Sequence, residues 1–302
     1  MSSLVESLQI RYAKMSEGID PTIDNWLLMK SPTNLLIIIA LYLVFVLRIG
    51  PSFMANRKPY NLQPIMVGYN AYQVIFNIWM FLQAFNAERS FAQILSNTCK
   101  SETDIDRVAQ VTMWSGAWWY FFSKVIDLLD TVFFVLRKKQ NQVTFLHVYH
   151  HTITALFSWC YLKYLPGEQG VVIGLLNSFV HIIMYFYYML AAMGPKYQKY
   201  LWWKKYMTVV QLIQFCLMLT YLTAVFIMDC NLPRSLTYFF GINVIIFLYL
   251  FGGFYRNAYS KKSEKIKSDE PSKNNLLANG DQLKQMINEC DKNNNETTKK
   301  FV

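Results

Sequence analysis

Three of the four histidines in this 302-residue chain lie within five positions of a single apolar run. The run reads LHVYHHTITALF (residues 146–157) and contains His147, His150 and His151. An imidazole can bind a metal ion, move a proton or, beside a suitable base, attack a carbonyl carbon. The spacing of three and four residues places all three rings on one side of a helix. The elements that hold these rings must therefore be found before their chemistry can be chosen.

Other polar side chains recur in neighbouring apolar stretches. Lys124, Asp127 and Asp130 are three residues apart, so they share one broad helical face. Later stretches add amides, an imidazole and phenols at helical spacing: Asn177, His181, Tyr185 and Tyr188, then Gln211 and Gln214. Each has a structural explanation when taken alone, as an internal ion pair or a bond between helices. Together they exceed what helix association requires, and we interpret them as one polar chamber.

The elements around this chamber are membrane-spanning helices. The chain is 54% hydrophobic and 16% charged, against roughly a quarter charged in soluble domains. Runs such as TNLLIIIALYLVFVL approach the roughly 20 residues that cross a bilayer. We therefore predict an all-α, polytopic membrane protein with seven transmembrane helices. The predicted spans are residues 33–49, 66–86, 112–136, 143–163, 170–193, 206–228 and 236–256.

The loops that follow the odd-numbered spans are richer in Lys and Arg than the loops that follow the even-numbered ones. This alternation predicts an N-terminus outside the cytosol and a C-terminus inside it. Residues 1–31 are then a non-cytosolic segment, 32–260 the seven-helix domain, and 261–302 a polar, disordered cytosolic tail. The tail ends with Lys299 and Lys300 third and fourth from the end, which predicts a dilysine signal for the endoplasmic-reticulum membrane.

The five cysteines show no CxxC spacing, so a structural zinc site is not expected. Cys99 and Cys230 both fall in predicted non-cytosolic loops, where an oxidising lumen would permit a disulfide. The sequence leaves open whether they pair or remain thiols. Cys160 and Cys216 lie within predicted spans and are expected to pack as small apolar side chains.

Four blocks of the sequence carry a family resemblance: KVIDLLDT (124–131), HVYHH (147–151), NSFVHIIMYFYY (177–188) and TVVQLIQF (208–215). In order and spacing they resemble the signature blocks of the very-long-chain fatty-acid elongases, the membrane 3-ketoacyl-CoA synthases. The resemblance covers about residues 25–260. One departure is Asp127, which stands where many members have Glu. The resemblance implies six spans that enclose an acyl tunnel, with the first span outside.

The resemblance also implies the reaction and the catalytic residues. Acyl-CoA would condense with malonyl-CoA to give a 3-ketoacyl-CoA two carbons longer, CO₂ and CoA, without a cofactor or a metal. His150 would carry the acyl group as an acyl-imidazole, and a general-base route without an acyl-enzyme stays open. The other residues expected to be catalytic would orient His150, move protons or polarise an oxygen: His147, His151, His181, Lys124, Asp127, Asp130 and Asn177.

Substrate-binding residues are expected on both sides of this group. Gln211, Gln214, Tyr185 and Tyr188 would line the thioester and acyl region. The phosphorylated head needs cations at the cytosolic mouth, and the candidates are Arg137, Lys138, Lys139, Lys204, Lys205 and Arg256. Membrane topology alone would also explain these cations. The expected partners are acyl-CoA, malonyl-CoA, the bilayer and the reductase and dehydratase of the same cycle.

Two other functions fit parts of the sequence. HxxHH on a membrane helix also resembles a di-iron desaturase or hydroxylase box, but such a box needs more histidines than the four present. A single zinc with three histidines stays open. A seven-span transporter or receptor is the alternative from another class, although no internal repeat is evident. Because topology distributes the positive charge, nucleic acid is not an expected partner. A homodimer is compatible with the sequence, and the preferred acyl length is not predicted.

Overall fold

The computed structural model describes residues 20–85, 91–99, 106–165, 167, 169–228, 230, 234–260 and 284. The chain divides into two units, Met1–Phe251 and Gly252–Val302. The described residues form helices joined by short turns, and none of them is in a strand. The predicted all-α class is therefore confirmed.

A helix occupies each of the seven predicted spans. These are α3 (Pro32–Val44, continued by η1, Phe45–Ile49, and α4, Gly50–Met54), α5 (Gln63–Gln83), α7 (Arg107–Leu136), α8 (Phe145–Tyr164), α9 (Gln169–Ala192), α10 (Lys204–Ile227) and α11 (Arg234–Tyr255). The shorter elements are α2 (Pro21–Asp24), α6 (Phe91–Ser96), η3 (Asn97–Cys99), η5 (Gln140–Gln142), η6 (Pro195–Tyr200) and η7 (Arg256–Ser260).

Five helical segments of the described chain are long and apolar enough to cross a membrane. They are Pro32–Met54, Gln63–Gln83, Gln169–Ala192, Lys204–Ile227 and Thr237–Tyr259. The two remaining long helices, α7 and α8, carry the charged residues and the three clustered histidines, which lower their mean hydropathy. The chain is therefore a membrane protein, and the count of seven spans stays a prediction.

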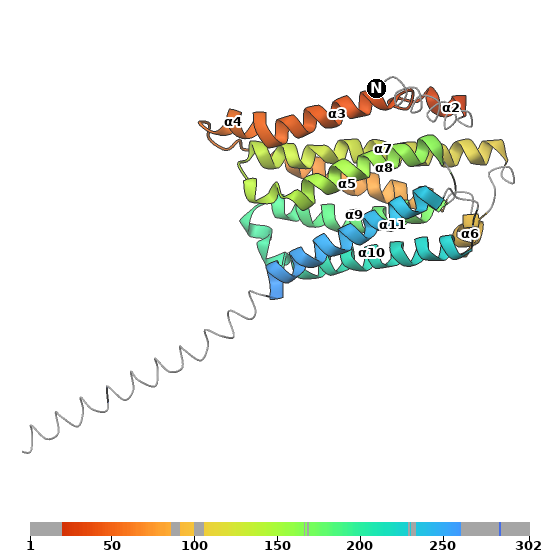
Figure 1. Ribbon diagram of the computed structural model, residues 1–302. Helices are drawn as coiled ribbons and strands as arrows, with labels where there is room; N and C mark the ends of the chain where they lie inside the picture. Colours follow the sequence, from red (N-terminus) through yellow and green to blue (C-terminus); the bar gives the residue numbers. More distant parts are fainter. Residues whose placement is uncertain are drawn as a thin grey trace, which may run out of the picture. The chain divides into compact units, whose positions relative to one another are not determined.

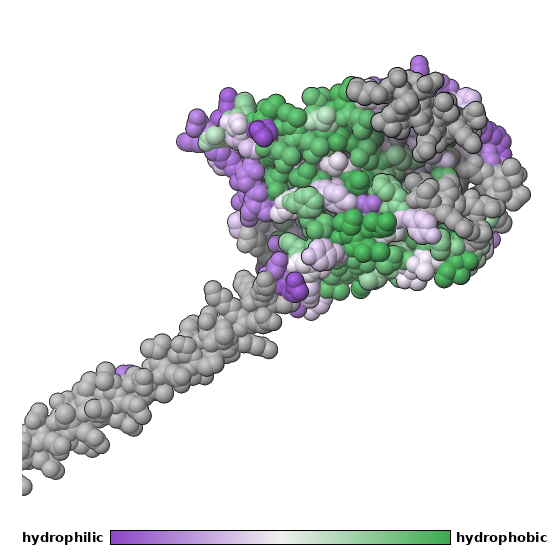
Figure 2. Space-filling view, in the orientation of Figure 1, coloured by the Kyte–Doolittle hydropathy of each residue, from purple (hydrophilic) through white to green (hydrophobic). Residues whose placement is uncertain are grey.

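The long helices of the first unit run alongside one another (Figure 1). α5 packs along α9, α7 along α8, and α10 against α9. A core of large side chains forms where α3, α7 and α8 meet, and it includes Ile39, Trp114, Phe121, Trp159 and Leu162. Apolar side chains also cover much of the outer face seen in Figure 2. Such a surface is costly in water and suits contact with lipid.

The first span is longer than predicted, because the helix does not end near residue 49. A π-helical turn, Phe45–Ile49, leads directly into Gly50–Met54. Pro51 lacks a backbone N–H, and the altered bonding of a π turn accommodates such a residue without breaking the helix. Gly50 is required here, because an added Cβ would lie 2.6 Å from Cγ1 of Val135 on α7.

Residues that precede the first span pack against the start of α7 and the end of α8. Lys163 on α8 is buried, pairs with Asp24 and donates to the carbonyl of Met29 at 3.0 Å. Arg107 at the start of α7 lies 2.8 Å from Asp20 and holds the pKa of that carboxyl below its usual value. These contacts fix the entry to the first span.

A disulfide joins Cys99, at the end of η3, to Cys230, just after α10. The two residues are 131 positions apart. The bond therefore links the loop after the second predicted span to the loop after the sixth. Cys160 and Cys216 are thiols in the structure.

Candidate active site

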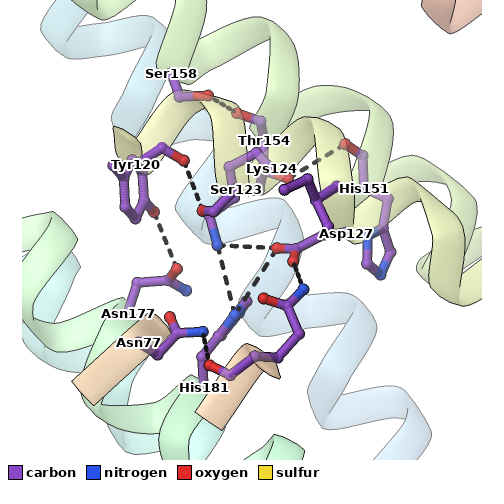
Figure 3. Close-up of polar contacts among 12 residues, drawn as sticks. Asn77, Tyr120, Ser123, Lys124, Asp127, His151, Thr154, Ser158, Asn177 and His181 are labelled. Atoms are coloured by element: carbon purple, nitrogen blue, oxygen red, sulfur yellow. Dashed lines mark hydrogen bonds and ion pairs between the residues drawn. The ribbon is translucent and has the colours of Figure 1, made fainter. Parts of the chain in front are cut away.

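The most buried charged group joins α7 to α9. Lys124 Nζ donates to Asp127 Oδ2 at 3.0 Å, and both side chains are buried. Nδ1 of His181 lies 3.5 Å from Lys124 Nζ and 3.9 Å from Asp127 Oδ2. Figure 3 shows the three side chains pointing toward one another. Because the spacing of α7 puts Lys124 and Asp127 on one face, a single facing histidine contacts both.

A phenol extends this group to the second carboxylate. The hydroxyl of Tyr185, on α9, is 3.0 Å from Asp127 Oδ1 and 2.8 Å from Asp130 Oδ2. A phenol carries one proton and can donate to only one carboxylate at a time. Tyr185 is completely buried. Tyr185 therefore bridges the two carboxylates but donates a hydrogen bond to only one of them at a time. Asp130 lies at the edge of the group.

Helix α5 supplies a partner that the sequence reasoning missed. Nε2 of Gln73 donates to Asp127 Oδ1 at 2.7 Å and lies 3.0 Å from the hydroxyl of Tyr69. Asn70, Gln73 and Asn77 are all buried along one side of α5. Their spacing of three and four residues was a signal in the sequence, but uncharged amides in a span are also ordinary interhelical contacts.

The three clustered histidines do not share one environment: His147 faces Thr131 on α7, whereas His150 faces a cavity. His147 Nε2 lies 3.0 Å from the hydroxyl of Thr131 on α7, and Thr131 is 2.8 Å from the hydroxyl of Tyr42 on α3. The ring centres of His147 and His151 are 4.3 Å apart. His147 and His151 therefore belong to a chain of contacts that leads toward α7 and α3. Thr131 and Tyr42 are part of this chain, and the sequence had not predicted either of them.

His150 instead lines a cavity of about 790 Å³. All four histidines lie within the described residues, and His150 is the one of the four that lines it. The walls come from α5, α7, α8, α9, α10 and α11, and their exposed area is mostly apolar. A cavity of this size and character is typical of a site for a mainly apolar small molecule. Its polar lining includes Asn177 and Gln214.

Tyr120 and Asn177 connect the cavity to the buried charged group. The Tyr120 hydroxyl donates to Asn177 Oδ1 at 3.0 Å, and both residues line the cavity. The Tyr120 ring centre is 4.8 Å from Lys124 Nζ. Lys124, Asp127 and His181 are buried and are not among the lining residues. Because its Oδ1 accepts from Tyr120, Asn177 directs its amide nitrogen elsewhere, where it can donate to another oxygen.

The residues expected to bind substrate are not all at the cavity. Gln214 lines it, whereas Gln211, Tyr185 and Tyr188 do not. The Gln211 amide nitrogen is 3.5 Å from Met184 Sδ, and the Tyr188 ring packs 6.1 Å from that of Tyr185. These three side chains therefore support the polar group from α9 and α10.

Five of the six predicted head-group cations lie at one end of the first unit. Arg137, Lys138 and Lys139 follow α7, and Lys204 and Lys205 begin α10 at the same end (Figures 1 and 2). Arg137 and Lys138 are held by contacts within the protein. Arg137 Nη1 lies 2.9 Å from Met66 Sδ, and Lys138 Nζ donates to the carbonyl of Ala55 at 2.9 Å. Arg256 lies in the second unit, within η7.

Two further predictions concern the tail and metals. Lys299 and Lys300 lie outside the described residues. Within the described part of the chain, no group of three or more His, Cys, Asp and Glu side chains is arranged to hold a metal ion. His181 lies beside a lysine ammonium, and a cation in that position opposes the binding of a second one.

These features define a class: an all-helical membrane protein with a buried ionic group beside an apolar cavity. The family model described as "ELO: GNS1/SUR4 family" matches residues 27–267. The chain is 42% identical to very long chain fatty acid elongase 7 of Drosophila melanogaster, over 88% of this chain and 80% of that one. It is 42% identical to elongase 7 of Rattus norvegicus, over 86% and 92% of the two chains. It is 41% identical to elongase 4 of Homo sapiens, over 86% and 82%. The chain belongs to the GNS1/SUR4 family of fatty acid elongases.

Proposed function

We propose that this protein is a 3-ketoacyl-CoA synthase that condenses a long-chain acyl-CoA with malonyl-CoA. The observation that carries the proposal is the position of His150, which faces the apolar cavity while Lys124, Asp127 and His181 form a buried ionic group beside it. An acyl chain would lie in the cavity with its thioester carbon at His150. The relatives named above are fatty acid elongases, which supports the same substrate class.

The first step would be acyl transfer to the enzyme. A ring nitrogen of His150 attacks the thioester carbon, the bond between that carbon and sulfur breaks, and CoA leaves as the thiol after it takes up the imidazole proton. This leaves an acyl-imidazole, which is a reactive acyl donor. His147 and His151 would hold the orientation of the HxxHH segment, because His147 is anchored to Thr131 and stacks on His151.

The second step would form the new carbon–carbon bond. Malonyl-CoA loses its free carboxylate as CO₂, and the electron pair left on C2 attacks the acyl carbon. The bond between that carbon and the His150 nitrogen breaks, and the nitrogen takes up a proton, which restores the neutral imidazole. The developing enolate oxygen needs donors, which the Asn177 amide and the Lys124 ammonium can supply. His181 would act at the malonyl unit, since it lies between Asn177 and Tyr185 on α9 and contacts Lys124. Asp127 and Asp130 would fix Lys124 and Tyr185.

The placement in the membrane is also part of the proposal. Seven spans would put the N-terminus in the lumen and the C-terminus in the cytosol, in the endoplasmic-reticulum membrane, with Lys299 and Lys300 as the retrieval signal. The cations at the end of α7 and the start of α10 would then face the cytosol and bind the phosphorylated head of CoA. The product would pass to a reductase and a dehydratase.

The proposal is tested with purified protein, malonyl-CoA and a series of acyl-CoAs, without a nicotinamide cofactor. We expect a 3-ketoacyl-CoA from the parent protein and no detectable product from His150→Ala. Intact mass measured before malonyl-CoA is added should show an acyl adduct that maps to His150. Product without an adduct would favour the general-base route over the acyl-imidazole.

A metal-dependent lipid hydroxylase or desaturase is the competing enzyme. It predicts stoichiometric iron or zinc in the purified protein and no condensation product at any acyl length. That pair of results would overturn the synthase proposal. The separate directions of His147 and His150 argue against one shared metal, since only His150 lines the cavity among the four histidines.

A further inference from the structure

The cavity extends along three helices away from His150. On α8 its wall contains His150, Thr154, Phe157, Ser158 and Tyr161. Tyr161 follows His150 by eleven positions, which corresponds to a rise of about 16 Å along the helix. These residues recur at helical spacing, so they form one continuous face. The cavity is therefore deep in one direction. It begins near His150 and passes Tyr161, and it continues to Leu165 just after α8 and to Asp106 and Val108 at the start of α7.

The side chain of Tyr161 is fixed where the cavity passes the end of α8. Its hydroxyl accepts from the backbone N–H of Gly170 at 2.7 Å and donates to the carbonyl of Gly167 at 2.6 Å. Both glycines line the cavity. A Cβ at Gly170 would lie 2.4 Å from the Tyr161 ring, so only glycine permits this close contact. The ring is thus held against the turn between α8 and α9, where it forms a rigid part of the cavity wall.

Two other glycines leave the middle of the cavity open. Gly116 lies on the face of α7 that carries Tyr120 and Lys124, lines the cavity and has no atom within 4 Å of an added Cβ. Gly174 lies on the face of α9 that carries Asn177, and its added Cβ would meet only Tyr120, at 3.8 Å. A larger side chain at either position would therefore project into the cavity without displacing backbone.

We propose that Gly116 and Gly174 set how far an acyl chain enters the cavity, and that the fixed ring of Tyr161 limits the space beyond them. These three residues then determine the longest acyl chain that the protein accepts. The inference rests on the proposed function, because it assigns the cavity to the acyl chain of that reaction. The inference adds which side chains limit the length of the acyl chain. Gly116 lies four positions from Tyr120, so a side chain at Gly116 would stop the acyl chain about 6 Å beyond Tyr120.

The test compares Gly116→Leu and Gly174→Leu with the parent protein. Each receives malonyl-CoA and an equimolar mixture of saturated acyl-CoAs that differ by two carbons. We expect the longest elongated chain to shorten by at least one two-carbon step in both variants, with at least a tenfold loss of product from the longest chain relative to the shorter ones. Tyr161→Ala should shift the upper limit in the opposite direction by at least one step.

Gly68→Leu is the matched control. Gly68 lies on α5, is exposed, has no atom within 4 Å of an added Cβ and does not line the cavity. Gly68→Leu makes the same substitution in another membrane helix. This variant should elongate the same range of acyl-chain lengths as the parent. The two glycine variants decide the matter if Tyr161→Ala does not fold. An unchanged upper limit in both, with product still formed, would overturn the inference while leaving the proposed function intact.

A second measurement separates the two proposals further. Thermal stabilisation by each acyl-CoA reports binding without turnover. If the parent protein makes no 3-ketoacyl-CoA, the proposed reaction is overturned, and the stabilisation profile still shows whether Gly116→Leu and Gly174→Leu lose the longest chains first. The same profile in parent and both variants would overturn the length inference by itself.

Discussion

Gln73 on α5 donates a hydrogen bond to Asp127 on α7, with 2.7 Å between Nε2 and Oδ1. Asp127 also accepts from Lys124, so the amide and the ammonium hold its two oxygens. A donor to a buried carboxylate stabilises it by roughly 1.5–3 kcal/mol. We expect Gln73→Leu to lower kcat about tenfold, which corresponds to about 1.4 kcal/mol, because Asp127 then orients Lys124 less firmly.

The control for Gln73→Leu is Asn70→Leu, one turn earlier on the same buried side of α5. The Asn70 amide donates only within its helix, to the carbonyl of Met66 at 2.7 Å, so its loss should leave the rate near that of the parent. Steady-state condensation rates for both variants decide the point. Equal losses in the two would show that any polar change on α5 is harmful and that Gln73 has no special role.

Asp127→Ala leaves the Lys124 ammonium buried without its carboxylate. Removing one member of a buried ion pair typically costs about 3–5 kcal/mol. We therefore expect a clear fall in the thermal unfolding temperature in detergent, together with loss of condensation. Asp127→Glu keeps the charge and matches the residue that the family often has, so it should retain most of the stability. A similar fall with Glu would mean that side-chain length, and not charge, dominates at this position.

Tyr120→Phe removes the hydroxyl that orients Asn177 and keeps the ring beside Lys124. The lost hydrogen bond is worth about 1 kcal/mol, so a fall in kcat of roughly five- to tenfold is expected. KM for the acyl-CoA should change little, because the ring that lines the cavity remains. Tyr72→Phe, at an exposed position on α5, is the control. A raised KM with unchanged kcat would place Tyr120 in binding alone.

Cys99→Ser breaks the bond to Cys230 across 131 residues. Loss of a disulfide that closes a long loop costs about 2–5 kcal/mol, so the unfolding temperature should fall. Peptide mapping under non-reducing conditions should show the Cys99–Cys230 peptide in the parent and not in Cys99→Ser. Cys216→Ser, at an exposed thiol, should change neither result. An unmodified Cys99 thiol in freshly purified parent protein would contradict the bond.

From the sequence alone we could predict the all-α class, the positions of the seven long helices and the polar faces of α7, α8, α9 and α10. Helical faces repeat every few residues, so Lys124 and Asp127, or Asn177 and His181, could be placed together from spacing alone. The family could also be recognised from the four blocks. These properties are local, because they depend on residues within one or two turns.

Which of these faces meet depends on how the helices pack. The spacing put His147, His150 and His151 on one side of a helix, yet the packing of α8 turns His147 toward Thr131 and His150 toward the cavity. Gln73 contacts Asp127 because α5 and α7 are neighbours, although 54 residues separate the two along the chain. Likewise, residue 50 must be glycine because the first helix passes so close to Val135 on α7 that a Cβ has no room there. Such contacts depend on how each helix is rotated against distant neighbours, and helical periodicity does not contain that rotation.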